Sequence, residues 1–565
     1  MENIEQIIKN SALKDKKWEK ILKQCNEELH FLSILTPIME YLFLELADQL
    51  KNKYPKLLSF VKKTLLIEHI FENFVNHVNP MIIRLCILEM HYLSQKNILK
   101  GNTSEERFTY FIQLLSNPSN LLDFLNKYSV VKEQIVIFSK QFLTVNLELF
   151  ARLDQDHEEV FSMLLNFRVD IEKLELISIE TSGDRHQEGH GVMILVFNYL
   201  GKETKLVYKP RSLAIDIAFQ QFIEWFNHVN EVSELYTFKI IDKNNYGWCE
   251  YVEYAFCQNL KEIELFYFRL GVLLMILYLL GGYDMHAENL VAHGSFPVIV
   301  DYECLLPPLY SLDGNFDQDN SRSLVSKTLF LPMDFKITEE GGGFDLSAIG
   351  ASGGEKVDTK IINWIDIGKD TMRAIRGEEK VPSFLNKPKT FRKKQIDFLN
   401  YEKNIIKGFQ QAYRFFLKNR NLLLKRNSTP LNLFKNKRVR IVFRDTEAYM
   451  RLLYEKWHPQ FVHWKEGNNQ YHSWVKTVLE EIPSMKTLFP FELQDLEQGN
   501  VPIFTCLTTE KKIVDSNNVP INILVKQSGY ETIFENIKKY LNEKDLKEQI
   551  GIIKTSFEQA REKNF

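Results

Sequence analysis

The sequence lacks the features that mark several common protein classes. Its six cysteines include no Cys-x-x-Cys pair, which argues against a disulfide framework and against a cysteine-rich zinc site. A net charge of −3 gives no overall attraction to nucleic acid or to an acidic membrane. The N-terminal stretch is charged throughout and has no apolar segment of a secretory signal. We therefore expect a cytoplasmic protein with reduced thiols that does not bind nucleic acid.

Long apolar runs are also scarce. The most apolar run covers residues 270–282, is flanked by Arg269 and Asp284, and is too short to cross a bilayer. We expect a buried helix that leads directly into the polar segment behind it and fixes the position of that segment. No membrane span is expected.

The polar segment behind this run, GGYDMHAENLVAHGSFPVIVDYE, is the most chemically suggestive part of the chain. The spacing Asp-x-His-x-x-Asn of Asp284, His286 and Asn289 brings three side chains to one point only in a tight turn. An alternating strand then leads to Asp301, and Glu303 follows. Carboxylate and carboxamide oxygens suit Mg²⁺, which bridges the phosphates of ATP. The segment predicts phosphoryl transfer, with Asn289 and Asp301 holding the metal and Asp284 facing the acceptor hydroxyl.

One feature of many ATP-binding proteins is missing, because neither Gly-x-Gly-x-x-Gly nor a Walker A pattern occurs. The nearest glycine-containing loop is GDRHQEGHG, where Asp184 and His186 are unusual neighbours for anionic phosphates. A hairpin at YLGKET is expected to join the strands MILVFNY and TKLVYK. Lys209 ends the second strand, and we expect it to pair with the α and β phosphates.

A second basic site is indicated in RVRIVFRDTEAY. Arg440 and Arg444 flank apolar residues on an expected strand that runs into a helix start near Thr446. The arginine guanidinium can bind phosphate bidentately, and a helix N-terminus also attracts anions. The lysine- and arginine-rich stretch from 387 to 426 is instead spread along expected helices and is typical of a solvated face.

Apolar spacing divides the chain into four expected regions. Helical spacing dominates 1–155, and alternating patterns replace it in 156–260, where strands and an amphipathic helix near 213–229 are expected. The apolar helix, the polar segment and a loop rich in glycine between 341 and 354 belong to 261–430, with helices returning from about Thr359. A strand, the helix near Thr446 and a mostly helical remainder make up 431–565.

The order of these elements is that of a two-lobed kinase: a strand pair with a lysine, a helix, strands, a second helix, the polar loop and a hairpin ending in Asp. The expected fold class is therefore α+β. Its two-lobed kinase-like catalytic core would span 156–260 and 261–430, with extensive helical additions at both ends of the chain.

Six motifs in the same order resemble the dehydratase domain of LanM-type class II lanthipeptide synthetases: SGDRHQEGHG, VYKPRSL, GGYDMHAENL, VIVDYE, FDLSAIG and RIVFRDTEAY. The resemblance covers most of the chain. That dehydratase is similar to lipid kinases in its core, in agreement with the order of elements. The resemblance implies phosphorylation of Ser and Thr in a ribosomally made precursor peptide with a leader, using ATP and Mg²⁺. Elimination of phosphate then leaves dehydroalanine or dehydrobutyrine.

Carried over motif by motif, the resemblance implies two sets of residues. The set for phosphoryl transfer is Lys209, Asp284, His286, Asn289, Asp301 and Glu303, of which Lys209 and Glu303 would contact the nucleotide. The set for elimination is Asp184, His186, Arg440 and Thr446, and Arg440 would hold the phosphate. The sequence leaves open which base takes the α-proton.

Full-length members of the family append a zinc-dependent LanC-like cyclase, whose ligands include cysteines and a histidine. The chain printed here ends at Phe565 without them. We therefore expect no ring closure by this chain and a separate LanC-like cyclase as a partner. A stand-alone dehydratase, half of a split enzyme and a shortened synthetase all agree with the composition.

Two other interpretations stay open. In the first, the protein is a kinase that phosphorylates a peptide or small molecule without elimination, and Arg440 and Thr446 are structural. In the second, it is a kinase-like pseudoenzyme that binds a leader peptide, against which the intact set around Asp284 argues. The helical N-terminal region is our hypothesis for leader docking.

Overall fold

The structure is a computed structural model of the whole chain. It describes residues 4–10, 20, 27–164, 170, 173–313, 324–333, 335–336, 343–353, 356–380, 383–391, 396–462 and 464–562. The chain divides into two compact units. Unit 1 comprises Met1–Pro210, Ile362–Arg376 and Arg444–Pro502, and unit 2 comprises Arg211–Ile361, Gly377–Phe443 and Ile503–Phe565.

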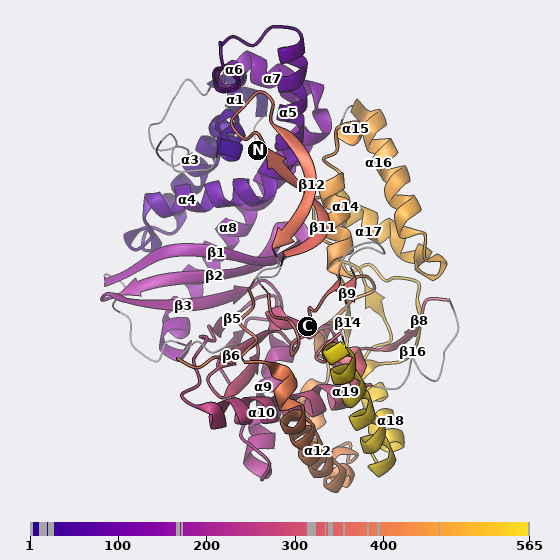
Figure 1. Ribbon diagram of the computed structural model, residues 1–565. Helices are drawn as coiled ribbons and strands as arrows, with labels where there is room; N and C mark the ends of the chain where they lie inside the picture. Colours follow the sequence, from indigo (N-terminus) through magenta and orange to yellow (C-terminus); the bar gives the residue numbers. More distant parts are fainter. Residues whose placement is uncertain are drawn as a thin grey trace. The chain divides into compact units, whose positions relative to one another are not determined.

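Unit 1 begins with the helical region that the sequence predicts (Figure 1). Local capping sets where its helices start: Thr103 and Glu106 form a reciprocal capping box at α6, and Asn117 with Pro118 starts α7. The helices are α1 (Ile4–Asn10), α3 (Thr36–Lys53), α4 (Lys63–Asn73), α5 (Asn79–Gln95), α6 (Ser104–Leu115), α7 (Pro118–Lys127) and α8 (Ser129–Leu164). The last of these runs beyond 155, where the sequence analysis ends the region.

An antiparallel strand meander follows in unit 1. Its strands are β1 (Leu174–His186), β2 (His190–Tyr199) and β3 (Lys202–Lys209). Between β2 and β3, Leu200 and Gly201 form a two-residue turn in which both φ angles are positive. Such turns match the twist of hairpin strands, and the predicted hairpin at YLGKET is confirmed. Lys209 is the last residue of β3 and is buried.

Residues 356–380 form a β-hairpin, so the prediction that helices return from about Thr359 was wrong. The hairpin pairs β11 (Lys356–Ile365) with β12 (Arg373–Lys380). In unit 1 its tip is anchored by Asp370, whose carboxylate accepts hydrogen bonds from Arg107, Ser94 and Ser104. These partners lie 263 to 276 residues away in the chain, so no local pattern reveals them. Helices return only at α12 (Glu402–Lys418).

The remainder of unit 1 is helical, as predicted. Its helices are α14 (Thr446–Glu455), α15 (Pro459–Val462), α16 (Trp464–Leu479) and α17 (Phe489–Glu497). Buried side chains from α14, α15, α16 and α17 and from the chain just after α17 form one apolar cluster. Its members are Tyr449, Leu452, Leu453, Phe461, Tyr471, Val475, Leu479, Leu496 and Val501. This cluster is called the α14–α17 core below.

Unit 2 contains the predicted apolar helix, α10 (Leu260–Leu280), which packs closely against α12. A Cβ added to Gly271 would lie 1.9 Å from the carbonyl oxygen of Ile405, and a Cβ on Gly408 would lie 1.9 Å from that of Phe268. Because the two backbones touch at these glycines, α10 has a fixed position ahead of the loop that follows it.

The other elements of unit 2 are shorter. The helices are α9 (Ala214–Val229), α13 (Arg420–Leu423), α18 (Gly529–Tyr540) and α19 (Glu543–Glu562). Paired strands are β4 (Ile240–Asp242) with β5 (Gly247–Glu250), β6 (Leu290–His293) with β7 (Phe296–Ile299), β8 (Leu309–Ser311) with β16 (Leu524–Gln527), β9 (Phe335–Lys336) with β10 (Gly343–Phe344), and β13 (Arg438–Ile441) with β14 (Phe504–Leu507), which also pairs with β15 (Ile513–Val514). The predicted helix near 213–229 and the extended piece near VPIFTCLTT are confirmed.

Two helical segments among the described residues are long and apolar enough to cross a bilayer by length and composition, His30–Lys53 and α10. Half of the tested window is buried within the former and 83% within the latter. Burial of this extent is typical of a core helix, in line with the prediction for α10.

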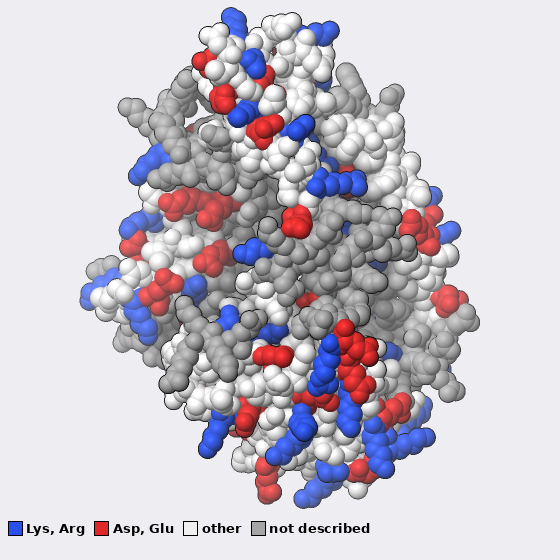
Figure 2. Space-filling view, viewed as in Figure 1, with Lys and Arg blue, Asp and Glu red and all other residues white. Residues whose placement is uncertain are grey.

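The surface and the thiols agree with the sequence analysis. Lys403, Lys407 and Lys418 are exposed on α12, and Figure 2 shows basic side chains mixed with acidic ones over the helices of unit 2. Within the described residues the cysteines are buried and form no disulfide, while Cys25 lies outside them. The mixture of helix and strand fits the α+β class. A two-lobed kinase-like core stays a prediction.

Candidate functional site

The loop after α10 carries the first group of predicted site residues. Gly281 ends the helix in the left-handed region, at φ 63°, and lets the chain turn sharply. Asp284 follows with φ 59°, a value that is uncommon for a residue with a side chain. Such strained backbone persists only where surrounding contacts hold it, and it concentrates at functional sites.

Asn289 supplies one of the contacts that hold Asp284. Its Nδ2 donates to the main-chain carbonyl of Asp284 over 3.0 Å. The main-chain carbonyl of Asn289 accepts from the N–H of Val300, also over 3.0 Å, at the open end of the β6–β7 hairpin. Asn289 and Asp301 therefore lie at the same end of one hairpin, as the sequence predicts. The strand itself ends at Ile299, two residues before Asp301.

The FDLSAIG motif lies against this loop within unit 2. His286 forms an antiparallel bridge with Ser347, and the N–H of Ala287 donates to the carbonyl of Leu346 over 2.9 Å. The His286 imidazole is 28% exposed at the edge of the loop. Of the predicted glycine-rich loop, the described residues include Gly343, Gly350 and Gly353. Outside them lie Gly341, Gly342 and Gly354.

Arg211 connects the carboxylates that follow the hairpin. Its guanidinium donates to Asp301 Oδ1 over 2.7 Å and lies 3.2 Å from Glu303 Oε2. It also binds both carboxylate oxygens of Asp216, at 2.6 and 3.1 Å. Because Asp216 lies in the first turn of α9 and is buried, this bidentate pair fixes Arg211 and through it the two site carboxylates.

Arg440 is joined to Glu303 twice. Its Nη1 donates to Glu303 Oε1 over 2.8 Å, and its main-chain N–H donates to the Glu303 carbonyl over 2.8 Å. The hydroxyl of Tyr283, one residue before Asp284, donates to the Arg440 carbonyl. A residue predicted for elimination is thus in direct contact with a residue predicted for phosphoryl transfer.

Both arginines keep their charge in this setting. Burial by itself would lower the pKa of Arg440, but the adjacent Glu303 carboxylate raises that pKa above its usual range. Burial also lowers the pKa of Arg211, but the carboxylates of Asp216, Asp301 and Glu303 together raise it well above its usual value. The Arg440 and Arg211 side chains are 12% and 23% exposed, so the two cations remain partly open to an anionic ligand.

His186 and Asp184 lie in unit 1 at the end of β1. The ring nitrogen Nδ1 of His186 is 2.8 Å from the carbonyl oxygen of Val501, and the N–H of Val501 donates to the Arg185 carbonyl over 2.8 Å. Because a carbonyl oxygen only accepts, Nδ1 carries the hydrogen, and Nε2 is the basic nitrogen of the neutral ring. The bond to the Val501 carbonyl thereby fixes the orientation of the ring.

Arg185 fixes the hairpin turn beside these residues. Its guanidinium donates to the side chain of Gln141 over 2.7 Å and stacks over the Phe138 ring, and burial lowers its pKa to about 10. Gly189 completes the turn with φ 87°, and a Cβ there would lie 2.5 Å from the Arg185 guanidinium. Only glycine suits this position.

Thr446 is the first residue of α14, also in unit 1. Asp445 caps the helix by accepting from the N–H of Glu447 over 3.0 Å. Tyr449 of the same helix and Val501, which binds His186, both belong to the α14–α17 core. Residues 184–186 and Thr446 are therefore attached to one packed cluster, although 260 residues of sequence separate them.

The predicted site residues are divided between the units. Unit 1 holds Asp184, His186, Lys209 and Thr446. Unit 2 holds Asp284, His286, Asn289, Asp301, Glu303 and Arg440. Within unit 2 the structure brings together Asp284, Asn289, Asp301, Glu303 and Arg440. Within unit 1 it connects His186 and Thr446 through the α14–α17 core.

Comparison with known proteins identifies the family. The family model described as "Domain of unknown function (DUF4135)" matches residues 128–507, which is more than half of the chain and includes every predicted site residue. The chain belongs to the DUF4135 family. This family is associated with LanM-type synthetases, so the resemblance seen in the sequence is confirmed.

A curated relative of this DUF4135 chain is "Lacticin 481/lactococcin biosynthesis protein LcnDR2" of Lactococcus lactis subsp. lactis. The two sequences are 26% identical over 563 residues, which cover 91% of the chain and 56% of the relative. The chain thus spans a little over half the length of this relative. Its printed name assigns this relative to the biosynthesis of lacticin 481 and lactococcin.

Sequence reasoning missed Arg211 as a site residue in this DUF4135 chain. The sequence did contain a hint, because Arg211 stands two residues after the predicted site residue Lys209 in the motif VYKPRSL. A charged residue directly after Lys-Pro, however, does not reveal three carboxylate partners that lie 5 to 92 residues further along the chain. Only the fold brings Asp216, Asp301 and Glu303 to one guanidinium.

The donor atoms at the end of the β6–β7 hairpin fit a magnesium ion in chemical type. Asp301 and Asn289 offer the carboxylate and carboxamide oxygens that Mg²⁺ prefers. Among the described residues no group of three or more His, Cys, Asp or Glu is arranged to hold a metal. Mg²⁺ that is shared with nucleotide phosphates needs only one or two protein carboxylates, so the smaller donor set suffices.

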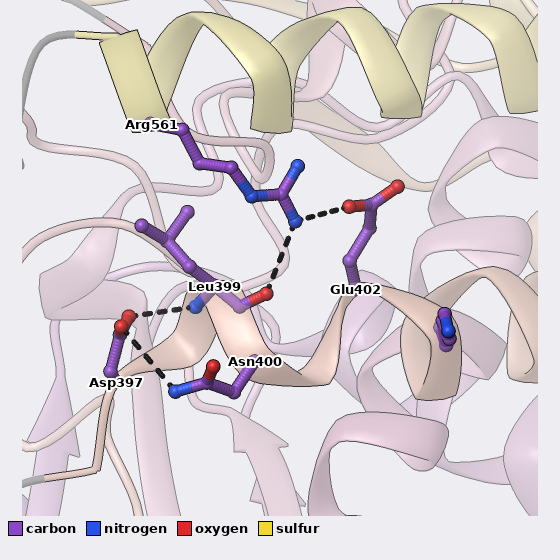
Figure 3. A pocket seen from close by; sticks show the side chains of 6 residues that line it. Asp397, Leu399, Asn400, Glu402 and Arg561 are labelled. Carbon is purple, nitrogen blue, oxygen red and sulfur yellow. Dashed lines mark hydrogen bonds and ion pairs between the residues drawn. The ribbon is translucent and has the colours of Figure 1, made fainter.

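Unit 2 contains a cavity of about 470 Å³ (Figure 3). Its walls come from Asp397, Leu399, Asn400, Glu402, Lys403 and Arg561. Arg561 of α19 reaches Glu402 at the start of α12 and the Leu399 carbonyl, and Asp397 accepts from the Leu399 N–H over 2.9 Å. These bonds connect α19 to α12, and no predicted site residue lines the cavity.

Proposed function

We propose that this DUF4135 chain dehydrates Ser and Thr residues of a ribosomally made precursor peptide. In this proposal the hydroxyl is first phosphorylated with ATP, and the phosphate is then eliminated to leave dehydroalanine or dehydrobutyrine. The observation that carries the proposal is the double contact between Arg440 and Glu303, because it joins the two predicted residue sets. The printed name of the lacticin 481 relative supports a peptide substrate of this class.

For the phosphorylation step, the strained Asp284 would accept the proton of the Ser or Thr hydroxyl. Asn289 and Asp301 would hold Mg²⁺, which when bound offsets the charge of the nucleotide phosphates. Lys209 and Glu303 would contact the nucleotide, and His286 would act at the edge of the loop. Arg211 positions Asp301 and Glu303 through its bidentate pair with Asp216.

For the elimination step, the bond between the β-carbon and the phosphate oxygen breaks, and its electron pair leaves with the phosphate. The α-proton passes to a base, and the electrons of the C–H bond form the new double bond. Arg440 would stabilise the departing phosphate charge, and Thr446 at the start of α14 would support it. Asp184 and His186 would donate and accept protons in this step. Which base takes the α-proton stays open.

The proposal also specifies partners and place. The substrate is a precursor peptide with a leader, and a LanC-like cyclase is the partner that would consume the dehydrated product. ATP and newly made peptide are both present in the cytoplasm, where we propose that the reaction takes place. The helical part of unit 1 is our hypothesis for leader docking.

Mass spectrometry of a leader-containing precursor peptide with Ser and Thr residues tests the proposal. The peptide is incubated with the protein, ATP and MgCl₂. Loss of one water per modified residue is expected. A stable phosphate adduct would identify a kinase without elimination, and an unchanged mass would identify a binding protein without chemistry, and either outcome would refute the proposal.

A further inference from the structure

Arg444 does not serve as a phosphate ligand in this structure, although the sequence pattern places it beside Arg440 and Thr446. Its Nε donates to Glu492 Oε1 over 2.6 Å, and its Nη2 donates to the Leu479 carbonyl, at the end of α16, over 2.7 Å. The Arg444 side chain is 8% exposed and that of Glu492 is fully buried. A cation held in this way is not available to an external anion.

Glu492 accepts hydrogen bonds from two residues that flank Thr446 in the sequence, Arg444 and Tyr449. Arg444 lies two residues before Thr446 in the chain, and Tyr449 lies three residues after it. The Tyr449 hydroxyl donates to the same oxygen, Glu492 Oε1, over 2.7 Å. The start of α14, with Thr446 as its first residue, is thus fixed to α17 by two bonds that converge on one atom.

A second connection attaches α14 to α17 at the other end. Lys456 caps the end of α14, and its Nζ contacts the carbonyls of Leu496 and Glu497 in the last turn of α17, at 3.2 and 3.1 Å. Lys456 is 2% exposed. Because both ends of α14 are attached, its orientation relative to α17 is fixed.

The chain just after α17 carries the connection on to His186. Gln498 and Asn500 donate their main-chain N–H groups to the Asp495 carbonyl, which closes a tight turn after the helix. Val501 then binds the main chain of Arg185 and the ring of His186. A continuous series of bonded residues therefore connects the start of α14, where Thr446 lies, to Glu492 and α17 and then to His186. All of these residues belong to unit 1.

Glu492 is chemically unusual for a purely structural residue. Its second oxygen, Oε2, is buried and has no hydrogen-bond partner. A buried carboxylate held by one oxygen only is costly, and an apolar pair of similar volume would stabilise a core at least as well. Retention of such a pair is reasonable where geometry, rather than stability, is required.

We infer that Arg444, Tyr449 and Glu492 are positioning residues that hold Thr446 in place relative to His186 for the elimination step. The inference rests on the proposed function, because it assigns these residues to one of the two proposed reactions. It predicts that their loss slows elimination selectively and leaves phosphorylation, which is assigned to residues of unit 2 and to Lys209, at its original rate.

The test compares Arg444→Lys with Arg107→Lys. Both arginines pair with a buried carboxylate inside unit 1, but the partner of Arg107 is Asp370 at the β11–β12 hairpin tip, which belongs to neither α14 nor α17. The rates of phosphorylation and elimination are followed by mass spectrometry of the precursor peptide with ATP and MgCl₂, and the Tm is measured in parallel. Arg444→Lys is expected to slow elimination at least tenfold, so that phosphopeptide accumulates. Arg107→Lys should lower the Tm without phosphopeptide accumulation.

Tyr449→Phe keeps the test decisive if Arg444→Lys does not fold. This variant retains the ring in the α14–α17 core and removes one hydrogen bond, so elimination should slow about fivefold. Wild-type elimination rates in both variants would overturn the inference and leave the proposed function intact. Equal slowing of both steps would also overturn it. A wild-type protein that never eliminates phosphate would refute the proposed function and the inference with it.

Discussion

Glu303 is the residue on which the two proposed reactions depend together. Its carboxylate receives Arg440 on one oxygen and Arg211 on the other, and its carbonyl receives the Arg440 main chain. A hydrogen bond to a charged group contributes about 1.5–3 kcal/mol. The position of the Arg440 guanidinium therefore depends on a residue that the sequence analysis assigned only to the nucleotide.

Glu303→Gln is predicted to slow both steps by about ten- to a hundredfold, because Arg440 loses its charged partner. Phosphorylation is measured with the precursor peptide, and elimination is measured separately with phosphopeptide supplied to the enzyme. Glu510→Gln, an exposed carboxylate after β14, is the control and should match the wild type. Normal elimination from supplied phosphopeptide by Glu303→Gln would contradict the shared role.

At the scale of single elements, glycines decide how closely α10 and α12 approach. Gly271→Ala would place a methyl group 1.9 Å from the Ile405 carbonyl oxygen. The helices would have to separate, at a cost of about 1–3 kcal/mol or more, and the Asp284 loop would shift with α10. We expect a lower Tm and weaker phosphorylation.

Gly551→Ala in α19 is the matched control for this prediction. Its Cβ would meet nothing within 4 Å, and alanine favours a helix over glycine by about 1 kcal/mol. The Tm should therefore rise slightly or stay unchanged. If Gly271→Ala has the same Tm as Gly551→Ala, the close contact between the two backbones is not required for stability.

A buried histidine makes unit 1 sensitive to acid. His69 lies on α4 between Asn146 and the Ile179 carbonyl, and burial lowers its pKa to about 4. A base with a lowered pKa in the folded state gives stability that is present above its unfolded pKa of about 6.5 and is lost as the pH falls towards 4. Unfolding should therefore become easier between pH 6.5 and pH 4.

Thermal unfolding at pH 7 and pH 5 measures this dependence. His69→Gln should reduce the drop in Tm between the two pH values, although His77, whose pKa burial lowers to about 3, retains part of it. His458→Gln, at an exposed position, should keep the full drop. An unchanged drop in His69→Gln would mean that other groups cause the acid sensitivity.

The elements themselves were largely predictable from the sequence. The alternation in MILVFNY and TKLVYK, the Leu-Gly turn and the apolar run of α10 each reflect local spacing, and each is confirmed. The β11–β12 hairpin was not predicted, because Asp370 and its partners on α5 and α6 are far apart in the chain. Local periodicity carries no information about such contacts.

At the scale of the whole molecule, the two proposed reactions have separable residue sets. Asp284→Ala should yield neither phosphate nor dehydration, and Thr446→Ala should accumulate phosphopeptide. Because the Asp284→Ala protein retains Arg440 and Thr446, it should dehydrate phosphopeptide that the Thr446→Ala protein has made. Mass spectrometry after mixing the two variants with peptide, ATP and MgCl₂ measures this complementation.

The control for this experiment is each variant alone at the total protein concentration of the mixture. Dehydrated peptide should form only in the mixture. Absence of dehydration in the mixture, with both variants folded, would mean that phosphopeptide does not leave one protein and enter another, or that the residue sets are not separable. Supplying purified phosphopeptide to the Asp284→Ala protein distinguishes the two.

The sequence by itself led to the chemistry proposed for this protein and predicted most of its elements in order, because motif spacing and apolar periodicity are local properties of a chain. Asp284, Asn289 and Asp301 were predicted as site residues in this way. Only the tertiary structure decided which charges meet. Arg440 binds Glu303, which is 137 residues away in the chain, and Arg444 binds Glu492, which is 48 residues away. Both ion pairs form only because the fold packs these distant segments together. Two arginines four residues apart look equivalent in sequence, and the fold gives them different carboxylate partners.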